Sequence, residues 1–142
     1  MISKKHDLKD SQKDQVVNRI SSYLMQRYGK IAAAYLFGSF NATGRFSDID
    51  LAILLDCPTD DPLDFEINLE IELEKIVKYP VDVRIINQAP LSFCREVICS
   101  GTVILDRRPN LRADFQSKIL KQYFDLIPFH RRYLREVANA PI

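Results

Sequence analysis

Two short stretches, Tyr35-Leu36-Phe37-Gly38-Ser39-Phe40 and Ser47-Asp48-Ile49-Asp50-Leu51, determine the architecture that the sequence predicts. The apolar run 31–37 reads as a buried strand that ends in Gly38-Ser39. Residues 49–55 are almost continuously apolar, which predicts a second strand inside a sheet. One strand is therefore expected to end at a glycine turn, and the next to begin with two aspartates.

Helices are predicted around these two strands. A first helix is expected from Ser11, and its apolar face repeats at helical spacing, with Val17, Ile20, Leu24 and Tyr28 on one side. Residues 63–73 alternate as in a strand, but the proline start at Pro62 and the glutamates that follow favour a helix, ended by Pro80.

The C-terminal half continues the alternation of strands and helices. Residues 81–86 alternate as a half-buried strand, 90–98 read as a short helix, and 102–105 as a short strand. A last helix is expected to be capped by Asn110 and to break or kink at Pro128. This order predicts the α/β (α+β) class, with a small mixed β-sheet flanked by helices.

Length and composition limit the classes of protein that remain. The 142 residues predict a single domain over 1–142, with residues 1–10 loose and 111–138 as a C-terminal helical segment. A net charge of +1 speaks against direct binding to nucleic acid, which usually needs a strongly basic balance. The three cysteines form no CxxC pair, and no apolar stretch approaches the roughly 20 residues of a membrane span. A cytoplasmic protein with no membrane partner is expected.

The aspartates suggest a cation site. Residues two apart in a strand point the same way, so Asp48 and Asp50 share a face, as do Asp82 and Arg84 on a later strand. If the two strands are neighbours, three carboxylates converge, and two of them about 4 Å apart would repel by roughly 4 kcal/mol. Mg²⁺ compensates such charge because it prefers oxygen ligands. The alternative is that these are ordinary solvated aspartates.

The Gly38-Ser39 pair suggests an anion site. Glycine allows close approach of the backbone to a ligand, and a turn that leads into a helix offers backbone N–H groups. An ordinary Gly-Ser turn is the alternative.

Together these residues resemble a known signature. Gly38-Ser39 followed, after eight residues, by Asp48-Ile49-Asp50-Leu51 resembles the DNA polymerase β-like nucleotidyltransferases. The chain resembles more closely their minimal nucleotidyltransferase (MNT) branch, the antitoxins of HEPN/MNT toxin–antitoxin pairs. The resemblance covers nearly the whole chain, with 81–83 as the strand of the third carboxylate. The eight-residue loop is shorter than is common in that branch.

The resemblance implies a function. The chain would be a metal-dependent antitoxin that transfers AMP from ATP to a tyrosine of a cognate HEPN-domain RNase toxin and so neutralises it. Asp48, Asp50 and Asp82 would be catalytic and would hold two Mg²⁺ ions. Nucleotide binding would fall to Gly38 and Ser39, with Arg45 in the connecting loop adding charge, although a solvated loop arginine is the plainer reading.

Two other functions stay open. A nucleotidyltransferase that acts on a small molecule would need a substrate pocket, for which the chain shows no second domain. A binding-only antitoxin would have no need of three convergent carboxylates. The last helix also has more apolar residues than one amphipathic face requires, which indicates either core packing or a docking surface: Tyr123, Phe124, Phe129, Tyr133 and Leu134.

Overall fold

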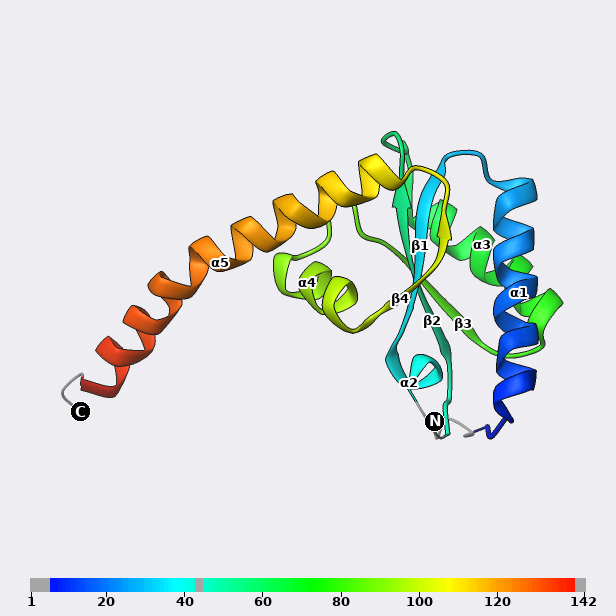
Figure 1. The fold of residues 1–142 in the computed structure, drawn as a ribbon, viewed down its shortest axis with the longest axis horizontal. Helices are drawn as coiled ribbons and strands as arrows, with labels where there is room; N and C mark the ends of the chain where they lie inside the picture. The colour runs from blue at the N-terminus through cyan, green and yellow to red at the C-terminus, as the bar shows by residue number, and fades with distance from the viewer. Residues whose placement is uncertain (1–5, 43–44, 140–142) are drawn as a thin grey trace.

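A mixed four-stranded sheet forms the centre of the computed structural model, which describes residues 6–42 and 45–139 (Figure 1). The strands are β1 (Ile31–Phe37), β2 (Ile49–Leu55), β3 (Val81–Ile85) and β4 (Thr102–Asp106). Their order is β3-β2-β1-β4, with β1 antiparallel to both neighbours and β2 parallel to β3. The predicted fold class is confirmed.

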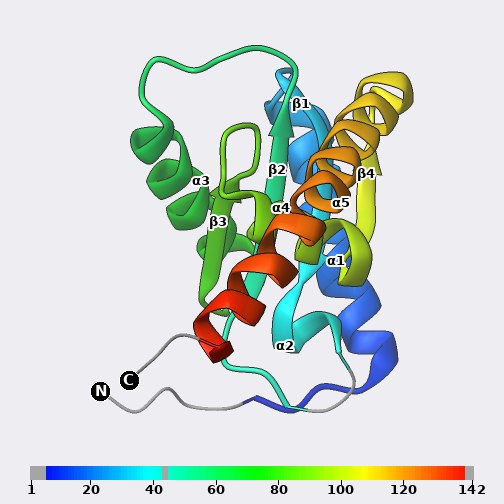
Figure 2. The same ribbon diagram turned by 90° about the vertical axis from the view of Figure 1, so that its left-hand side faces the viewer.

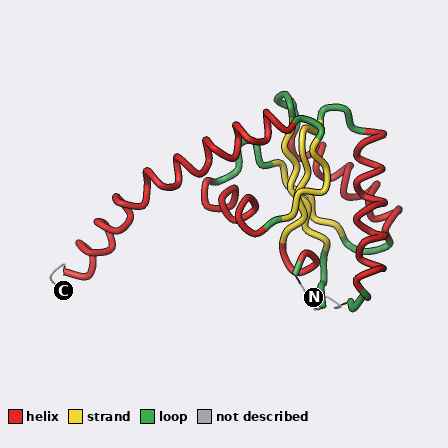
Figure 3. The backbone as a smooth tube through the Cα atoms, in the orientation of Figure 1, coloured by secondary structure: helices red, strands yellow, loops and turns green. Residues whose placement is uncertain are grey.

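Helices cover both faces of this sheet, as the view in Figure 2 shows. One face packs against α1 (Asp10–Arg27) and α3 (Pro62–Val77), and the other against α4 (Leu91–Ser100) and the start of α5 (Pro109–Asn139). A four-residue helix, α2 (Gly38–Asn41), joins β1 to β2. Figure 3 separates these helices from the strands by colour.

The alternation of side chains along β2 builds two cores. Ile49, Leu51 and Ile53 pack toward α1 and α3, whereas Ala52 and Leu54 pack toward α4 and α5. Both faces of a central strand are buried, so its sequence is almost wholly apolar. Asp50 is the one residue of β2 that is not fully buried, and by alternation it lies on the face of Ala52 and Leu54.

The ambiguous stretch 63–73 forms a helix, as predicted, because the Asp61 side chain accepts a hydrogen bond from the Asp64 amide and Pro62 begins the first turn. Three boundary predictions were wrong. The helix α3 ends at Val77, before Pro80, because Lys78 takes a left-handed conformation with φ of 67°.

The other two corrections concern α5. It begins at Pro109, so Asn110 lies in its first turn and does not cap it. It also continues through Pro128 as one helix, so of the expected break or kink the break does not occur. Proline removes one backbone hydrogen bond, and the bonds of the flanking turns suffice to hold this helix together.

The N-terminal segment, which was expected to be loose, is held in place from His6 onward. His6 forms an antiparallel bridge with Phe46, and its ring lies 5.6 Å from that of Phe46 and 4.9 Å from that of Tyr79. Residues 1–5 lie outside the described residues. The loop before β2 is therefore packed against the chain's own N-terminal segment.

The outer edge of β3 is bonded to a helix. Three glutamates on one side of α3 accept hydrogen bonds from the outward-facing amides of β3: Glu66 from Ile85 at 3.0 Å, Glu70 from Val83 at 3.1 Å and Glu74 from Val81 at 3.1 Å. Buried backbone N–H groups need such partners, since leaving one unpaired is costly. This glutamate ladder fixes β3 from the side opposite β2.

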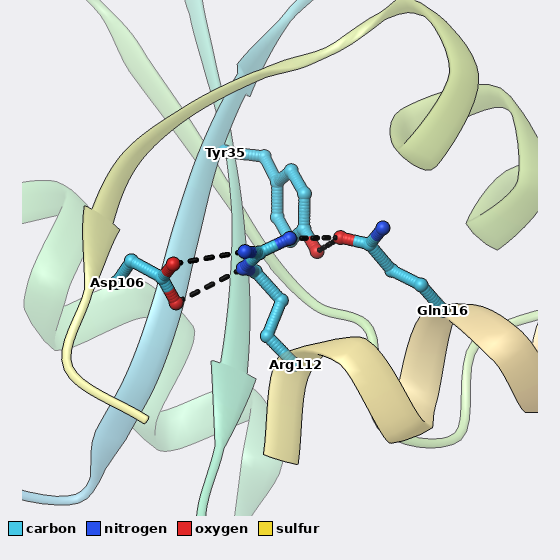
Figure 4. Close-up of polar contacts among 4 residues, drawn as sticks. All are labelled: Tyr35, Asp106, Arg112 and Gln116. Carbon is cyan, nitrogen blue, oxygen red and sulfur yellow. Dashed lines mark hydrogen bonds and ion pairs between the residues drawn. The ribbon is translucent and has the colours of Figure 1, made fainter. Parts of the chain in front are cut away.

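The start of α5 is anchored by the polar network in Figure 4. Arg112 donates to both carboxylate oxygens of Asp106 at 2.9 Å and to Gln116 at 2.8 Å, and Gln116 also accepts from the Tyr35 hydroxyl at 2.6 Å. Burial raises the pKa of Tyr35, which keeps its hydroxyl protonated as a donor. Beyond this network α5 extends away from the body of the protein (Figure 1). Among the described residues no helix is long and apolar enough to cross a bilayer.

Candidate active site

Two of the three predicted carboxylates lie side by side in the sheet. In the parallel pairing of β2 and β3, Asp50 is the register partner of Asp82, and in the antiparallel pairing of β1 and β2 it is the partner of Phe37. Neighbouring strands lie about 4.8 Å apart, and partners in register project to the same face. Asp82, Asp50 and Phe37 therefore form one row across the sheet, on the side of α4.

Gly38 is required by this row. Its φ of +74° lies in the left-handed region, and a Cβ atom at this position would stand 2.1 Å from the Asp50 Oδ2 atom. Any other residue would both strain the backbone and displace the carboxylate. The glycine that ends β1 thus allows the Asp50 carboxylate to lie against the backbone of the turn.

The electrostatics of Asp50 show that the three aspartates interact. Burial, followed by the negative charges of Asp82 and then Asp48, raises the pKa of Asp50 from 3.8 to about 6, while the positive charge of Arg84 opposes this shift. A carboxyl group poised near neutrality in a carboxylate cluster is typical of a functional site. Asp48 lies just before β2 and is half-buried, as are Asp50 and Asp82.

The donor set fits a hard divalent cation. It consists of carboxylate oxygens that repel one another, and a bound cation would relieve that repulsion. Within the described residues, however, no three His, Cys, Asp or Glu side chains are already grouped so as to hold a metal ion. Asp82 is drawn aside, since one of its oxygens lies 3.7 Å from Arg84 Nε. Its side chain is 41% exposed.

The predicted phosphate-binding residues flank this cluster. Gly38 and Ser39 form the first turn of α2, and Ser39 is exposed. Arg45 is exposed in the loop between α2 and β2. Residues 43–44 of that loop lie outside the described residues.

Two side chains with no role in the sequence prediction contact this region. Lys13 of α1 donates to the backbone oxygens of Phe40 at 3.3 Å and Ala42 at 3.2 Å, which holds the end of α2. Arg84 lies 5.8 Å from the centre of the Phe93 ring on α4, next to Asp82. Arg84 follows Asp82 by two residues in a strand, so the sequence already indicated that both side chains lie on one face. No local sequence pattern indicates that Lys13 contacts this region.

Comparisons with known proteins agree with this geometry. A profile of the family described as polymerase beta, nucleotidyltransferase matches residues 18–110, which is more than half of the chain. No curated protein was found to match the chain in sequence.

Several solved structures share its fold. One is a tri-AMPylated Shewanella oneidensis HEPN toxin in complex with an MNT antitoxin, with a TM-score of 0.70 at 22% identity, over 89% of this chain and 98% of the matched chain. The toxin–antitoxin MntA-HepT matches with 0.68 at 22%, over 88% and 98%. A toxin–antitoxin structure with AMP-PNP matches with 0.70 at 24%, over 86% and 98%.

The family profile contains both strands of the aspartate row and the glycine turn, and the solved structures agree with it in fold over most of the chain. This protein therefore belongs to the polymerase beta nucleotidyltransferase family.

Proposed function

We propose that this protein is an antitoxin enzyme that, with Mg²⁺, transfers AMP from ATP to a tyrosine of a HEPN-domain toxin in the cytoplasm. The observation that supports this most directly is the pairing of Asp50 with Asp82 beside Gly38. A nucleotidyl transfer needs such carboxylates next to a turn where the backbone can approach phosphates.

Asp48, Asp50 and Asp82 would hold the metal ions. When bound, the ions neutralise charge on the triphosphate and stabilise the attacking and leaving oxygens of an in-line displacement. Asp82, whose side chain is 41% exposed, would take the proton of the tyrosine hydroxyl. Gly38 and Ser39 would hold the phosphates of the departing pyrophosphate.

The choice of acceptor rests on the complexes that share the fold. One contains a tri-AMPylated HEPN toxin and another contains AMP-PNP. An AMP group adds negative charge and bulk, and at an RNase active site both would oppose the binding of RNA. The proposed partner is thus a HEPN toxin that loses activity when modified.

The test is a transfer assay with intact-mass readout. The purified protein is incubated with Mg²⁺, each nucleoside triphosphate and the HEPN-domain product of the neighbouring gene. The expected result is a mass gain of one or more AMP units on the partner with ATP alone. The gain should disappear with Asp48→Asn and with a chelator, and persist with the exposed control Asp60→Asn.

Two outcomes would contradict the proposal. If a stable complex forms and neutralises the toxin without any mass gain, the protein is a binding-only antitoxin. If the modified acceptor is a small molecule, the transfer chemistry is correct and the protein acceptor is wrong.

A further inference from the structure

The short helix α2, which carries the Gly38-Ser39 turn, depends on contacts from elsewhere in the chain. It has four residues and lies beside the first turns of α1 at one end of the sheet (Figures 1 and 2). A first helical turn is costly to form, because it fixes several residues for a single hydrogen bond. The position of this turn is therefore set by the side chains that pack on α2 and bond to it.

One charged side chain, Lys13 of α1, holds the C-terminal end of α2. Its Nζ atom donates to the backbone oxygens of Phe40 at 3.3 Å and Ala42 at 3.2 Å. Carbonyl groups at a helix end carry partial negative charge, so a cation stabilises them. The same Nζ atom lies 5.3 Å from the centre of the Phe40 ring and 5.5 Å from that of Phe46, which is the range of a cation–π contact. Lys13 thus contacts both α2 and the loop that follows it.

The two rings under this cation connect three segments that carry the predicted site residues. Phe40 of α2 and Phe46 of the loop before β2 are buried and lie edge to face, with their centres 4.8 Å apart. The Phe46 ring packs in turn on Tyr79, at 5.4 Å, in the turn before β3. Phe46 is two residues before Asp48, and Tyr79 is three residues before Asp82. This aromatic cluster therefore links the glycine turn to the segments that lead into both aspartates.

A second contact holds α2 from the opposite side. The side-chain amide of Asn41 donates to the Ser100 backbone oxygen at 3.2 Å, at the end of α4. Because α1 and α4 cover opposite faces of the sheet, α2 is bonded to both helical layers. Without the Lys13 contact, α2 would keep the Asn41 bond and lose its tie to α1. We therefore expect a displaced turn in a protein that is still folded.

We infer that Lys13 is a positioning residue for the nucleotide. Acting through α2, it fixes the Gly38-Ser39 turn relative to the Asp50–Asp82 pair. The inference rests on the proposed function in one respect, since it takes Gly38 and Ser39 as the residues that hold the phosphates. A triphosphate held jointly by this turn and by metal-binding carboxylates requires both at one fixed separation, and a misplacement of about 1 Å can cost roughly 100-fold in rate.

The test measures the binding of inorganic triphosphate with Mg²⁺ by calorimetry, which needs neither a nucleobase nor an acceptor protein. Lys13→Met keeps a long side chain and removes the charge and the donors, and it should weaken binding about tenfold. Lys13→Arg keeps the charge and the donors and should bind nearly as the wild type does. The matched control Arg19→Met removes a positive charge from an exposed position of the same helix and should also bind like the wild type.

Two further measurements separate positioning from a general loss of stability. In hydrogen exchange of the free protein, the Ala42 amide, which donates to the Gly38 oxygen at 3.3 Å, should exchange faster in Lys13→Met. The Gly101 amide, which is bonded at 2.8 Å to the Val97 oxygen of α4, should not change. In the transfer assay the same variant should raise the KM for ATP and leave the KM for the acceptor unchanged.

Two results would overturn the inference. Wild-type affinity for triphosphate in Lys13→Met would leave Lys13 with a role in stability alone. An equal loss in Arg19→Met would assign the effect to long-range charge. If Lys13→Met does not fold, Lys13→Gln provides the same comparison, because it also lacks the charge.

The proposed function fails separately. A wild-type protein that binds triphosphate, depends on Lys13 for it and transfers no AMP would contradict the proposed function and support the positioning role. A wild-type protein that binds no triphosphate with Mg²⁺ would overturn both.

Discussion

Replacing Asp50 with asparagine should stabilise the metal-free protein while it abolishes nucleotidyl transfer. The side chain keeps its shape against Gly38, so the packing of the turn is preserved. What changes is the charge, which burial and the two neighbouring aspartates disfavour. The ionised carboxylate of Asp50 therefore has a higher free energy in the folded protein than in the unfolded chain. Asparagine carries no charge and removes this destabilisation.

The magnitude follows from the pKa. A rise from 3.8 to about 6 is about two units, which sets an upper limit of roughly 3 kcal/mol at neutral pH. Solvent screening at a half-buried site reduces this to about 1–2 kcal/mol. For a chain of this length the melting temperature of Asp50→Asn should exceed that of the wild type by about 3–8 °C.

The pH dependence of stability tests whether the charge of Asp50 destabilises the folded protein. Because the pKa of Asp50 is raised in the folded state, the wild-type protein loses stability as pH rises from the unfolded value near 4 to the folded value near 6. The gain in unfolding free energy from Asp50→Asn should therefore reach its full size at about pH 8 and be about one third as large at about pH 4.5. It should vanish at pH values below both the unfolded and the folded pKa.

Thermal unfolding in the presence of a chelator measures this directly, with Asp60→Asn as the control for a lost surface charge. Added Mg²⁺ and ATP should then raise the melting temperature of the wild type more than that of the variant. A lower melting temperature for Asp50→Asn at pH 8, or a difference that does not vary with pH, would refute the reasoning.

Three further outcomes are expected. Gly38→Ala should cost about 2 kcal/mol or more of stability, because of its positive φ and the Asp50 contact; the loss should shrink in an Asp50→Ala background, and additive losses in a double-mutant cycle would contradict the contact. Glu70→Ala should cost about 1–3 kcal/mol by leaving the Val83 amide unpaired, with faster hydrogen exchange at that amide as the readout. Arg112→Lys, which loses the two-pronged pairing with its carboxylate partner, should cost about 1–2 kcal/mol, and unchanged exchange at the start of α5 would argue against its anchoring role.

Much of the candidate site is local in sequence, and that part was predictable. The two-residue period of a strand predicted that Asp48 and Asp50 share a face, and the apolar run after them predicted an internal strand. The internal strand is confirmed, whereas Asp48 lies just before β2 and its charge acts on Asp50. The pairing of Asp50 with Asp82 depended on β2 and β3 being neighbours, which the sheet confirms. Their role as metal ligands stays a proposal.

The features that escaped prediction depend on distant contacts or on short segments. Four residues are too few to show helical periodicity, so the extent of α2 after the Gly38-Ser39 turn could not be predicted. Lys13 contacts backbone atoms 27 and 29 residues away, and nothing near it in the sequence indicates this. At Pro128 the helix continues without a break, because the turns on both sides of the proline keep their own hydrogen bonds.

The glutamate ladder of α3 also specifies the register of β3 and thereby the position of Asp82 in the active site. Four residues of helix rise about 6.0 Å and two residues of strand about 6.6 Å, so the carboxylates of Glu66, Glu70 and Glu74 match three alternate amides of β3 over two steps. A slip of β3 by two residues would keep its apolar face buried, yet it would leave one glutamate without its amide. The helix behind the sheet thereby specifies the alignment that brings Asp82 level with Asp50.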